Sequence, residues 1–234
     1  MKSAGRPLES ALEVVPDVWS IRNRAFTSNT YVCRLEDNAG CLVIDPGLDH
    51  EALDRALARL RVRPAAVFCT HGHFDHLGGA ARLKDAFDAT LHIHAAERKV
   101  VQTANFTMMI CKVEGRIKVP QFDVEAADGS RYLSGADEVR FLHTPGHTPG
   151  SSFVCWRDCI FTGDTLYRDS VGLVSFPGED ASRLKQSLSR VWSLVPDASM
   201  ICPGHGGAGR FSGIKRDNTA LREFLGLTAT APHG

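Results

Sequence analysis

The sequence predicts a single α+β domain that spans residues 1–234. The chain is 43% hydrophobic and 23% charged, which is ordinary globular usage, and its length suffices to bury about 70–75% of its unfolded surface. Short apolar runs typical of strands alternate with stretches of helical periodicity. Five of the apolar runs lead into a histidine or an aspartate, so we expect these polar residues to share one edge of the fold.

Eight apolar runs predict the strands. Most of them are bounded by turn-forming residues such as Gly, Pro, Asn and Asp. The dipeptide Arg157-Asp158 predicts a hairpin turn between the sixth and the seventh run. The runs are Tyr31–Leu35, Cys41–Ile44, Val67–Cys69, Leu91–Ile93, Val139–Leu142, Phe153–Trp156, Cys159–Phe161 and Met200–Cys202.

Three segments show helical periodicity. One runs from Leu53 to Leu60 and is expected to end at Pro64, and another runs from Leu184 to Val195 and is expected to end at Pro196. A last helix is predicted from Ile214, Leu221 and Leu225. Residues 101–135 are weakly patterned, and we expect a loop-rich cover over a site there. Within them we interpret one apolar group as a buried patch rather than as a pocket lining: Phe106, Met108, Met109 and Ile110.

Composition narrows the functional classes. Lys plus Arg and Asp plus Glu number 27 each, so no net charge favours nucleic acid or a membrane surface, and a small-molecule substrate is expected. The seven cysteines are an odd count without C-x-x-C spacing, which indicates reduced core residues of a cytoplasmic protein. The N-terminus lacks a secretory apolar region, and no 18-residue apolar stretch occurs. The oligomeric state stays open.

Five predicted strands deliver a potential metal ligand to their C-terminal ends. Glycine and proline surround each of these positions, as expected where the backbone must turn sharply and side chains converge. The stretches are CLVIDPG with Asp45, AAVFCTHGHFDH with His71 to His76, VRFLHTPGH with His147, CIFTGD with Asp164, and MICPGH with His205.

The run THGHFDH places three histidines and an aspartate within six positions. Chance gives about 0.002 such patterns in a chain of this composition. His71 and His73 are two apart, so on an extended segment they face the same way and can hold one ion. Asp75 and His76, at the start of the next helix, can face a second ion. Imidazole and carboxylate ligands together suit Zn²⁺, Fe or Mn²⁺, and the lack of a nearby Cys pair argues against a closed structural zinc site.

Taken in order, these motifs resemble those of the metallo-β-lactamase superfamily, and the resemblance covers nearly the whole chain. It implies a four-layer αββα sandwich that binds two divalent metal ions, with zinc expected and iron or manganese as alternatives. By this likeness one ion is held by His71, His73 and His147, the other by Asp75, His76 and His205, with Asp164 bridging them and Asp45 orienting a ligand or the backbone.

Several residues outside these motifs have open roles. His143 precedes His147 by four residues, and we interpret it as a histidine that supports a ligand or the fold. Tyr167 is placed to donate a hydrogen bond to a substrate carbonyl, with a packing role equally open. Outside any motif, we expect surface or core histidines at His50, His92 and His94, and solvated charges at Arg168, Lys215 and Arg216.

The sequence predicts hydrolysis by an activated water. Two bound ions lower the pKa of a bridging water to about 7, and the hydroxide attacks an activated carbonyl. The chain has no G-x-S-x-G elbow and no papain-like cysteine setting, which disfavours covalent acyl transfer. If the leaving group is an alkoxide, Asp75 is the candidate proton donor.

Within the superfamily, HTPGHTPGS, GDTLY and FPGED resemble motifs of the glyoxalase II-like hydrolases, which implies a hydroxyacylglutathione-like thioester. Two features depart from that group: the stretch GLVSFPGED, and the mere thirty or so residues after His205 in place of a C-terminal helical domain. The aspartate at position 164 disfavours lactam hydrolysis. Two alternatives remain: an acyl homoserine lactonase, suggested by Tyr167, and a mononuclear-iron persulfide dioxygenase.

Overall fold

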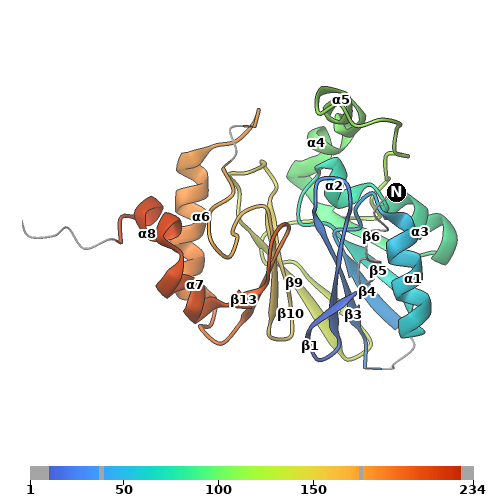
Figure 1. The fold of residues 1–234 in the computed structure, drawn as a ribbon, viewed down its shortest axis with the longest axis horizontal. Helices are drawn as coiled ribbons and strands as arrows, with labels where there is room; N and C mark the ends of the chain where they lie inside the picture. The colour runs from blue at the N-terminus through green and yellow to red at the C-terminus, as the bar shows by residue number, and fades with distance from the viewer. Residues whose placement is uncertain (1–10, 37–39, 174–175, 228–234) are drawn as a thin grey trace, which may run out of the picture.

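The computed structural model describes residues 11–36, 40–173 and 176–227, so the stretch GLVSFPGED lies partly outside the described residues. Two β-sheets pack face to face, and helices cover both outer faces (Figure 1). This arrangement confirms the predicted four-layer αββα sandwich.

The first sheet has seven strands in the order β1 to β7. Pairing is antiparallel from β1 to β4 and parallel from β4 to β7. The strands are β1 Leu12–Val15, β2 Val18–Arg22, β3 Asn29–Arg34, β4 Gly40–Ile44, β5 Arg63–Phe68, β6 Thr90–His94 and β7 Val124–Ala126. The helices on this side are α1 His50–Leu60, α2 Phe74–Leu77, α3 Ala80–Phe87, the 3₁₀ turn η1 Ala95–Glu97, α4 Arg98–Gln102 and α5 Ala104–Ile110.

The second sheet has six strands in the order β13-β12-β11-β10-β9-β8. Only the β11–β12 pair is parallel. The strands are β8 Arg131–Ser134, β9 Asp137–His143, β10 Ser152–Trp156, β11 Cys159–Gly163, β12 Met200–Pro203 and β13 Gly209–Arg210. The helices that cover it are α6 Ala181–Leu194, α7 Phe211–Asp217 and α8 Thr219–Leu225.

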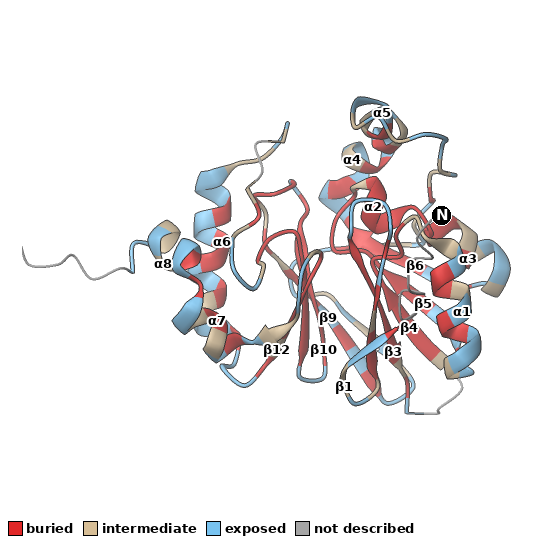
Figure 2. Ribbon diagram, viewed as in Figure 1, coloured by how far each residue is buried: buried red, intermediate tan, exposed pale blue. Residues whose placement is uncertain are grey.

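Alternating side chains on the strands build three apolar layers. Figure 2 shows that buried residues dominate the strands of both sheets and that the helices are exposed on their outer sides. Phe68, Phe141 and Trp156 pack in the layer between the two sheets. Their neighbours in sequence point the other way: Val67 packs toward the helices of the first sheet, and Cys155 toward those of the second. Most residues of the central strands β3, β4, β10 and β11 are buried, so both faces of the sheets are covered where these strands lead to the edge that carries the polar residues.

The eight predicted strands are confirmed, whereas the helix boundaries need correction. Helix α1 ends at Leu60, where Arg61 adopts the left-handed conformation, and Pro64 lies within β5. The predicted last helix is two helices, α7 and α8, separated at Asn218. The side chain of Asn218 caps α8 by accepting a hydrogen bond from the Leu221 N–H.

The loop-rich cover expected over residues 101–135 is wrong for much of its length, because α4, α5, β7 and β8 fall in or next to it. The apolar patch predicted there is also not buried as a unit. Met108 is buried, but Phe106, Met109 and Ile110 are exposed on α5. All seven cysteines are free thiols, as expected, and Cys111 alone is not fully buried. Of the helices in the described ranges, none has the length and hydropathy needed to span a membrane.

Candidate metal centre

Seven histidine and aspartate side chains gather at the edge where strands of both sheets end. The first sheet supplies four of them, from the turn after β5 and from the short helix α2. The second sheet supplies three, from the segments that follow β9, β11 and β12. The seven are His71, His73, Asp75, His76, His147, Asp164 and His205.

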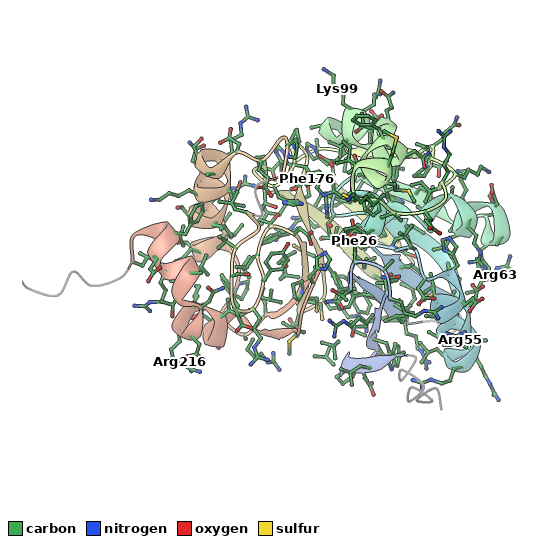
Figure 3. All side chains as sticks on the ribbon, turned by 45° about the horizontal axis from the view of Figure 1, so that its top comes forward. Phe26, Arg55, Arg63, Lys99, Phe176 and Arg216 are labelled. Carbon is green, nitrogen blue, oxygen red and sulfur yellow. The ribbon has the colours of Figure 1, made fainter. Side chains whose placement is uncertain are left out.

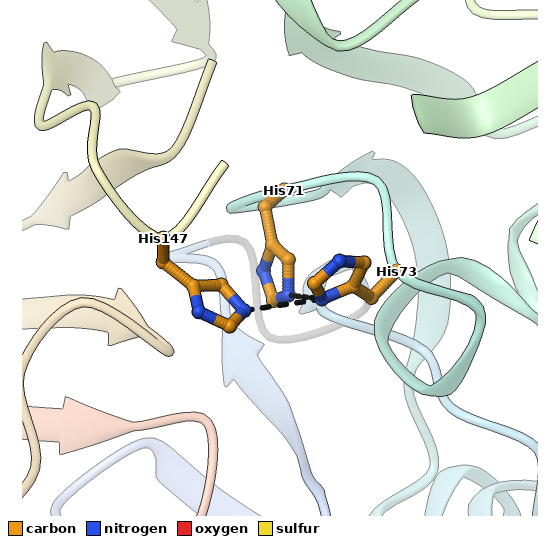
Figure 4. Close-up of side chains that lie close together, drawn as sticks. All are labelled: His71, His73 and His147. Carbon is orange, nitrogen blue, oxygen red and sulfur yellow. Dashed lines mark hydrogen bonds between the residues drawn. The ribbon is translucent and has the colours of Figure 1, made fainter. Parts of the chain in front are cut away.

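Three imidazoles form the first group (Figure 4). The Nε2 atoms of His71 and His147 each lie 3.1 Å from Nδ1 of His73. Nδ1 of His73 carries either one proton or one lone pair, so a hydrogen bond to one neighbour leaves the other neighbour unexplained. Three histidines that bind one metal ion account for the convergence of all three nitrogens. Burial lowers the pKa of both His71 and His73, the latter to about 4, which keeps the rings in the neutral form that binds metals.

Asp75, His76 and His205 form the second group, with ligand atoms within 4.8 Å of one another. Asp164 reaches both groups. Its Oδ2 lies 3.3 Å from His205 Nε2 and 3.8 Å from His147 Nε2, and its Oδ1 lies 3.4 Å from His76 Nε2. The resemblance implied this division of ligands, with a carboxylate between the two groups.

Charge compensation in the second group is strong. Burial opposes a positive charge on His76 and His205, yet the carboxylates of Asp164 and Asp75 raise the pKa of both rings, that of His205 to about 9. Conversely, despite burial, His76 and His205 hold the pKa of Asp164 well below its usual range. The two carboxylates therefore favour cationic partners, and a divalent ion competes with protons for this face of the cluster.

Two buried atoms test whether metal ions fit. Within the described residues, neither His76 Nε2 nor Asp164 Oδ1 has a hydrogen-bond partner, which is costly unless another group satisfies them. Gly204 lies against the same two side chains: a Cβ there would lie 2.1 Å from Asp164 Oδ1 and 2.7 Å from His76 Cε1. Five imidazoles and two carboxylates suit zinc, iron or manganese. The donor set thus fits two divalent ions.

Asp45 lies behind the cluster, where it contacts His76 of the second group and reaches His71 of the first group through Thr70. Its two oxygens accept hydrogen bonds from the Thr70 N–H and the Thr70 hydroxyl, each 2.7 Å long, and Oδ2 also lies 3.1 Å from His76 Nδ1. The Thr70 hydroxyl is in turn 3.0 Å from Nδ1 of His71. Since these bonds occupy its oxygens, Asp45 is placed to orient two histidines rather than to hold an ion itself.

Glu97 is a site residue that sequence reasoning missed. Its side chain is fully buried, and its two oxygens accept hydrogen bonds from the N–H groups of Gly72 and Gly150, each 2.6 Å long. Gly72 stands between His71 and His73, and Gly150 follows His147 in the next loop. Glu97 therefore joins the two loops that carry the first group. In the sequence it stands in an ordinary charged run, ERK, with no motif to distinguish it.

The residues with open roles separate into two sets. Burial, together with the nearby Asp164 carboxylate, raises the pKa of Tyr167 well above its usual range. His143 does not join the cluster: its Nε2 donates to the Pro149 carbonyl at 2.9 Å, and its ring stacks on His94 with centroids 4.0 Å apart. It thus supports the loop that carries His147.

A cavity of about 500 Å³ opens above both ligand groups. Phe26, Phe74, Phe176, Tyr167 and Arg168 are among the residues that line it. Arg168 lines the cavity and is also a solvated charge, as expected, since its side chain is 61% exposed. Lys215 and Arg216 form ion pairs with Asp197 and Asp217. Sequence reasoning also missed the aromatic side of the cavity, because Phe26 and Phe176 stand in stretches without periodicity.

Comparisons with known proteins agree with this geometry. The family model described as "Metallo-beta-lactamase superfamily" matches residues 23–205. The chain is 31% identical over 208 residues to an uncharacterized protein of Mycobacterium tuberculosis, covering 82% of this chain and 92% of that protein. It is 27% identical over 183 residues to a probable metallo-hydrolase of Bacillus subtilis, covering 76% of this chain and 85% of that protein. It is 24% identical over 183 residues to a probable polyketide biosynthesis zinc-dependent hydrolase of Bacillus velezensis, covering 78% of this chain and 75% of that protein.

Solved structures show the same fold. A B3 metallo-β-lactamase, BLEG-1, superposes with a TM-score of 0.79 at 28% identity, covering 87% of this chain and 99% of that one. A protein solved in a di-iron-bound form superposes with a TM-score of 0.75 at 29% identity, covering 86% of this chain and 98% of that one. ETHE1 from Myxococcus xanthus superposes with a TM-score of 0.71 at 26% identity, covering 92% of this chain and 91% of that one. These neighbours differ in their metals or activities, so they leave the metal and the substrate of this chain open.

Proposed function

The chain belongs to the metallo-β-lactamase superfamily, and from that membership we propose that it is a zinc-dependent thioester hydrolase of the glyoxalase II-like type, with a hydroxyacylglutathione-like compound as reference substrate. The observation that carries the proposal is the pair of ligand groups joined by Asp164 at the floor of an open cavity. Two relatives, a probable metallo-hydrolase of Bacillus subtilis and a probable zinc-dependent hydrolase of Bacillus velezensis, support the reaction class.

The chemistry divides between the ions and the chain. The two ligand groups, together with Asp164 between them, would hold two divalent ions, which when bound would supply a water of lowered pKa as nucleophile. The chain fixes the ligands: Asp45 and Thr70 orient His76 and His71, and Glu97 holds the loops of the first group in place. The cavity above admits a carbonyl substrate directly to this floor.

The nature of the leaving group favours a thioester over a lactone. A thiolate, with a pKa of about 8.5, departs without a proton, whereas an alkoxide needs an acid. Tyr167 lines the cavity, but burial and the nearby Asp164 carboxylate raise the pKa of its hydroxyl, so this side chain gives up a proton poorly. In a lactonase the proton would have to come from Asp75, which also lines the cavity but whose pKa His76 and His205 hold well below its usual range despite burial.

The first experiment is thiol release from S-lactoylglutathione and a short acyl-CoA by zinc-reconstituted protein, with metal-stripped protein alongside. We expect release only with metal. Asp164→Asn is expected to lower bound zinc and to slow release by more than about 100-fold. The matched control is Asp85→Asn, because Asp85 is an exposed carboxylate paired with Lys118 and is expected to leave both values unchanged.

Other outcomes would replace the proposal. Metal-dependent opening of acyl homoserine lactones without thiol release would identify a lactonase. One iron per chain together with oxygen uptake on a persulfide substrate would identify a dioxygenase. Full zinc content and full rate in Asp164→Asn would show that this carboxylate does not join the two ions.

A further inference from the structure

The turn between β2 and β3 is strained. Phe26 and Thr27, at its centre, both have left-handed backbone conformations, with φ of 60° and 53°. This conformation costs about 1–2 kcal/mol for a residue with a side chain, and bulky or β-branched residues adopt it rarely. Glycine or asparagine would relieve the strain. A phenylalanine kept at such a position indicates a use for its side chain outside folding.

The Phe26 side chain does not serve the core. It is 44% exposed, and within the described residues it belongs to none of the three apolar layers. Its ring instead meets Phe74 edge to face, with centroids 5.0 Å apart, at the cavity. Phe74 directly precedes the ligand Asp75.

Phe176 extends this apolar surface to the ligands themselves. Its ring contacts the His73 ring edge to face, with centroids 5.3 Å apart. It lies outside the apolar layers of the described chain, as Phe26 does. Figure 3 shows Phe26 and Phe176 in the middle of the molecule, carried by segments far apart in sequence. Phe26, Phe74 and Phe176 all line the cavity, and we call these three side chains the aromatic wall: the first two contact each other, and the third contacts the ligand His73.

We propose that the aromatic wall binds an apolar acyl group attached to the scissile carbonyl, so that among thioesters those of medium-chain aliphatic or aryl acids are preferred. This inference rests on the proposed thioester hydrolysis. The wall adjoins His73, so the groups that meet it are those nearest the reacting carbon. Each methylene buried there is expected to increase binding about fourfold.

The test varies only the acyl group. In a series of N-acetylcysteamine thioesters from acetyl to octanoyl, we expect kcat/KM of the zinc-loaded enzyme to rise up to about fourfold per methylene beyond butanoyl. Phe26→Gly, which also relaxes the turn, is expected to reduce octanoyl hydrolysis about tenfold more than acetyl hydrolysis. Phe106→Ala is the matched control, since Phe106 is 58% exposed on α5 and lies outside this cavity.

A binding measurement separates this inference from the proposed reaction. Non-hydrolysable S-alkyl thioethers of N-acetylcysteamine, from ethyl to octyl, are titrated by calorimetry into wild-type protein and Phe26→Gly. Binding that tightens with chain length and weakens in Phe26→Gly, without any thioester hydrolysis, would leave the aromatic wall standing and overturn the reaction. Hydrolysis and binding that are both independent of acyl length, or equal losses at every length in Phe26→Gly, would overturn the inference.

Discussion

Glu97 shows how one buried carboxylate supports several ligands at once. Because its two oxygens accept from Gly72 and Gly150, Glu97→Gln replaces one acceptor by an amide group that faces a backbone N–H. The loops of His71, His73 and His147 are then no longer held together. We expect zinc affinity to fall about 10–100-fold, with the fold retained, as measured by competition with a chromophoric chelator and by circular dichroism.

The matched control for Glu97 is Glu125→Gln. Glu125 is a partly exposed carboxylate that pairs with Arg98 on the surface, and its replacement is expected to leave zinc affinity unchanged. If Glu97→Gln binds zinc as tightly as the wild type, the link between the loops is not needed for the ligand geometry.

His92 gives the stability a pH dependence separate from the metal centre. Its ring stacks on Phe68 at 4.4 Å, its Nδ1 has no partner within the described chain, and burial lowers its pKa from 6.5 to about 4. Between these pH values the unfolded chain binds a proton that the folded one excludes, so stability falls as pH drops. We expect His92→Phe to lessen this loss by about 1–2 kcal/mol at pH 4.5.

Urea denaturation of both proteins at pH 7.5 and 4.5 tests this expectation. The difference in unfolding free energy between wild type and His92→Phe should grow toward pH 4.5 in favour of the variant. Equal differences at both pH values would mean that His92 does not exclude its proton in the folded protein.

At the scale of single residues, sequence predicted ligand types better than their supports. The positions His71 to His76, His147, Asp164 and His205 were recognisable because scarce residue types follow apolar runs at fixed spacing, and the structure brings them together. Glu97 and Thr70 act through backbone groups or through one hydroxyl, and such contacts depend on loop packing that no spacing encodes.

At the scale of elements, a continuous apolar run made a strand predictable. Central strands such as β4 and β10 are such runs, because both faces are covered. Strand β1 is half-exposed at the sheet edge, β8 alternates exposed and intermediate residues, and β13 has only two residues, so their sequences carry little apolar signal. Sequence analysis overlooked these three strands, the three-residue β7, and also β2, whose VWSIR sequence is mostly buried but interrupted by a serine.

The break between α7 and α8 links a helix end to the cavity. Asn218 is buried there: its Oδ1 accepts from the Leu221 N–H, and its Nδ2 donates to the carbonyls of Tyr167 and Ser170. Asn218→Ala removes the cap and leaves two carbonyls without this donor. We expect a loss of about 1–3 kcal/mol in unfolding free energy and a raised KM, because the Tyr167–Ser170 segment lines the cavity.

Asn218→Asp separates the two roles of this side chain. A carboxylate retains the cap but cannot donate to the carbonyls of Tyr167 and Ser170. Helix stability should therefore be largely retained, whereas KM should rise as in the alanine variant. If both variants keep the wild-type KM, the link to the cavity segment has no part in substrate binding.

At the scale of the whole molecule, the candidate metal centre joins the two sheets. His71, His73, Asp75 and His76 come from the side of the first sheet, and His147, Asp164 and His205 come from the second. Each ligand group draws on both sheets. Ions bound there would add a connection between halves of the sandwich that already meet through the apolar layer between them and through hydrogen bonds such as those of Gly150 to Glu97 and Tyr31 to Pro203.

Zinc binding is therefore expected to stabilise the whole domain rather than one loop. At a free zinc concentration 100 times the dissociation constant, each site adds about 2.7 kcal/mol to the unfolding free energy. For a chain of this size that corresponds to roughly 5–10 °C in Tm per site. Calorimetric scans of metal-stripped and zinc-loaded protein measure this increase in Tm. In Asp164→Asn, which weakens the contact between the two ligand groups, zinc should raise Tm by at most half as much.

A single unfolding transition that moves as a unit is expected, since the ligands come from both sheets. Equal Tm values with and without zinc, or a shift confined to a minor early transition, would show that the ions do not hold the two sheets together.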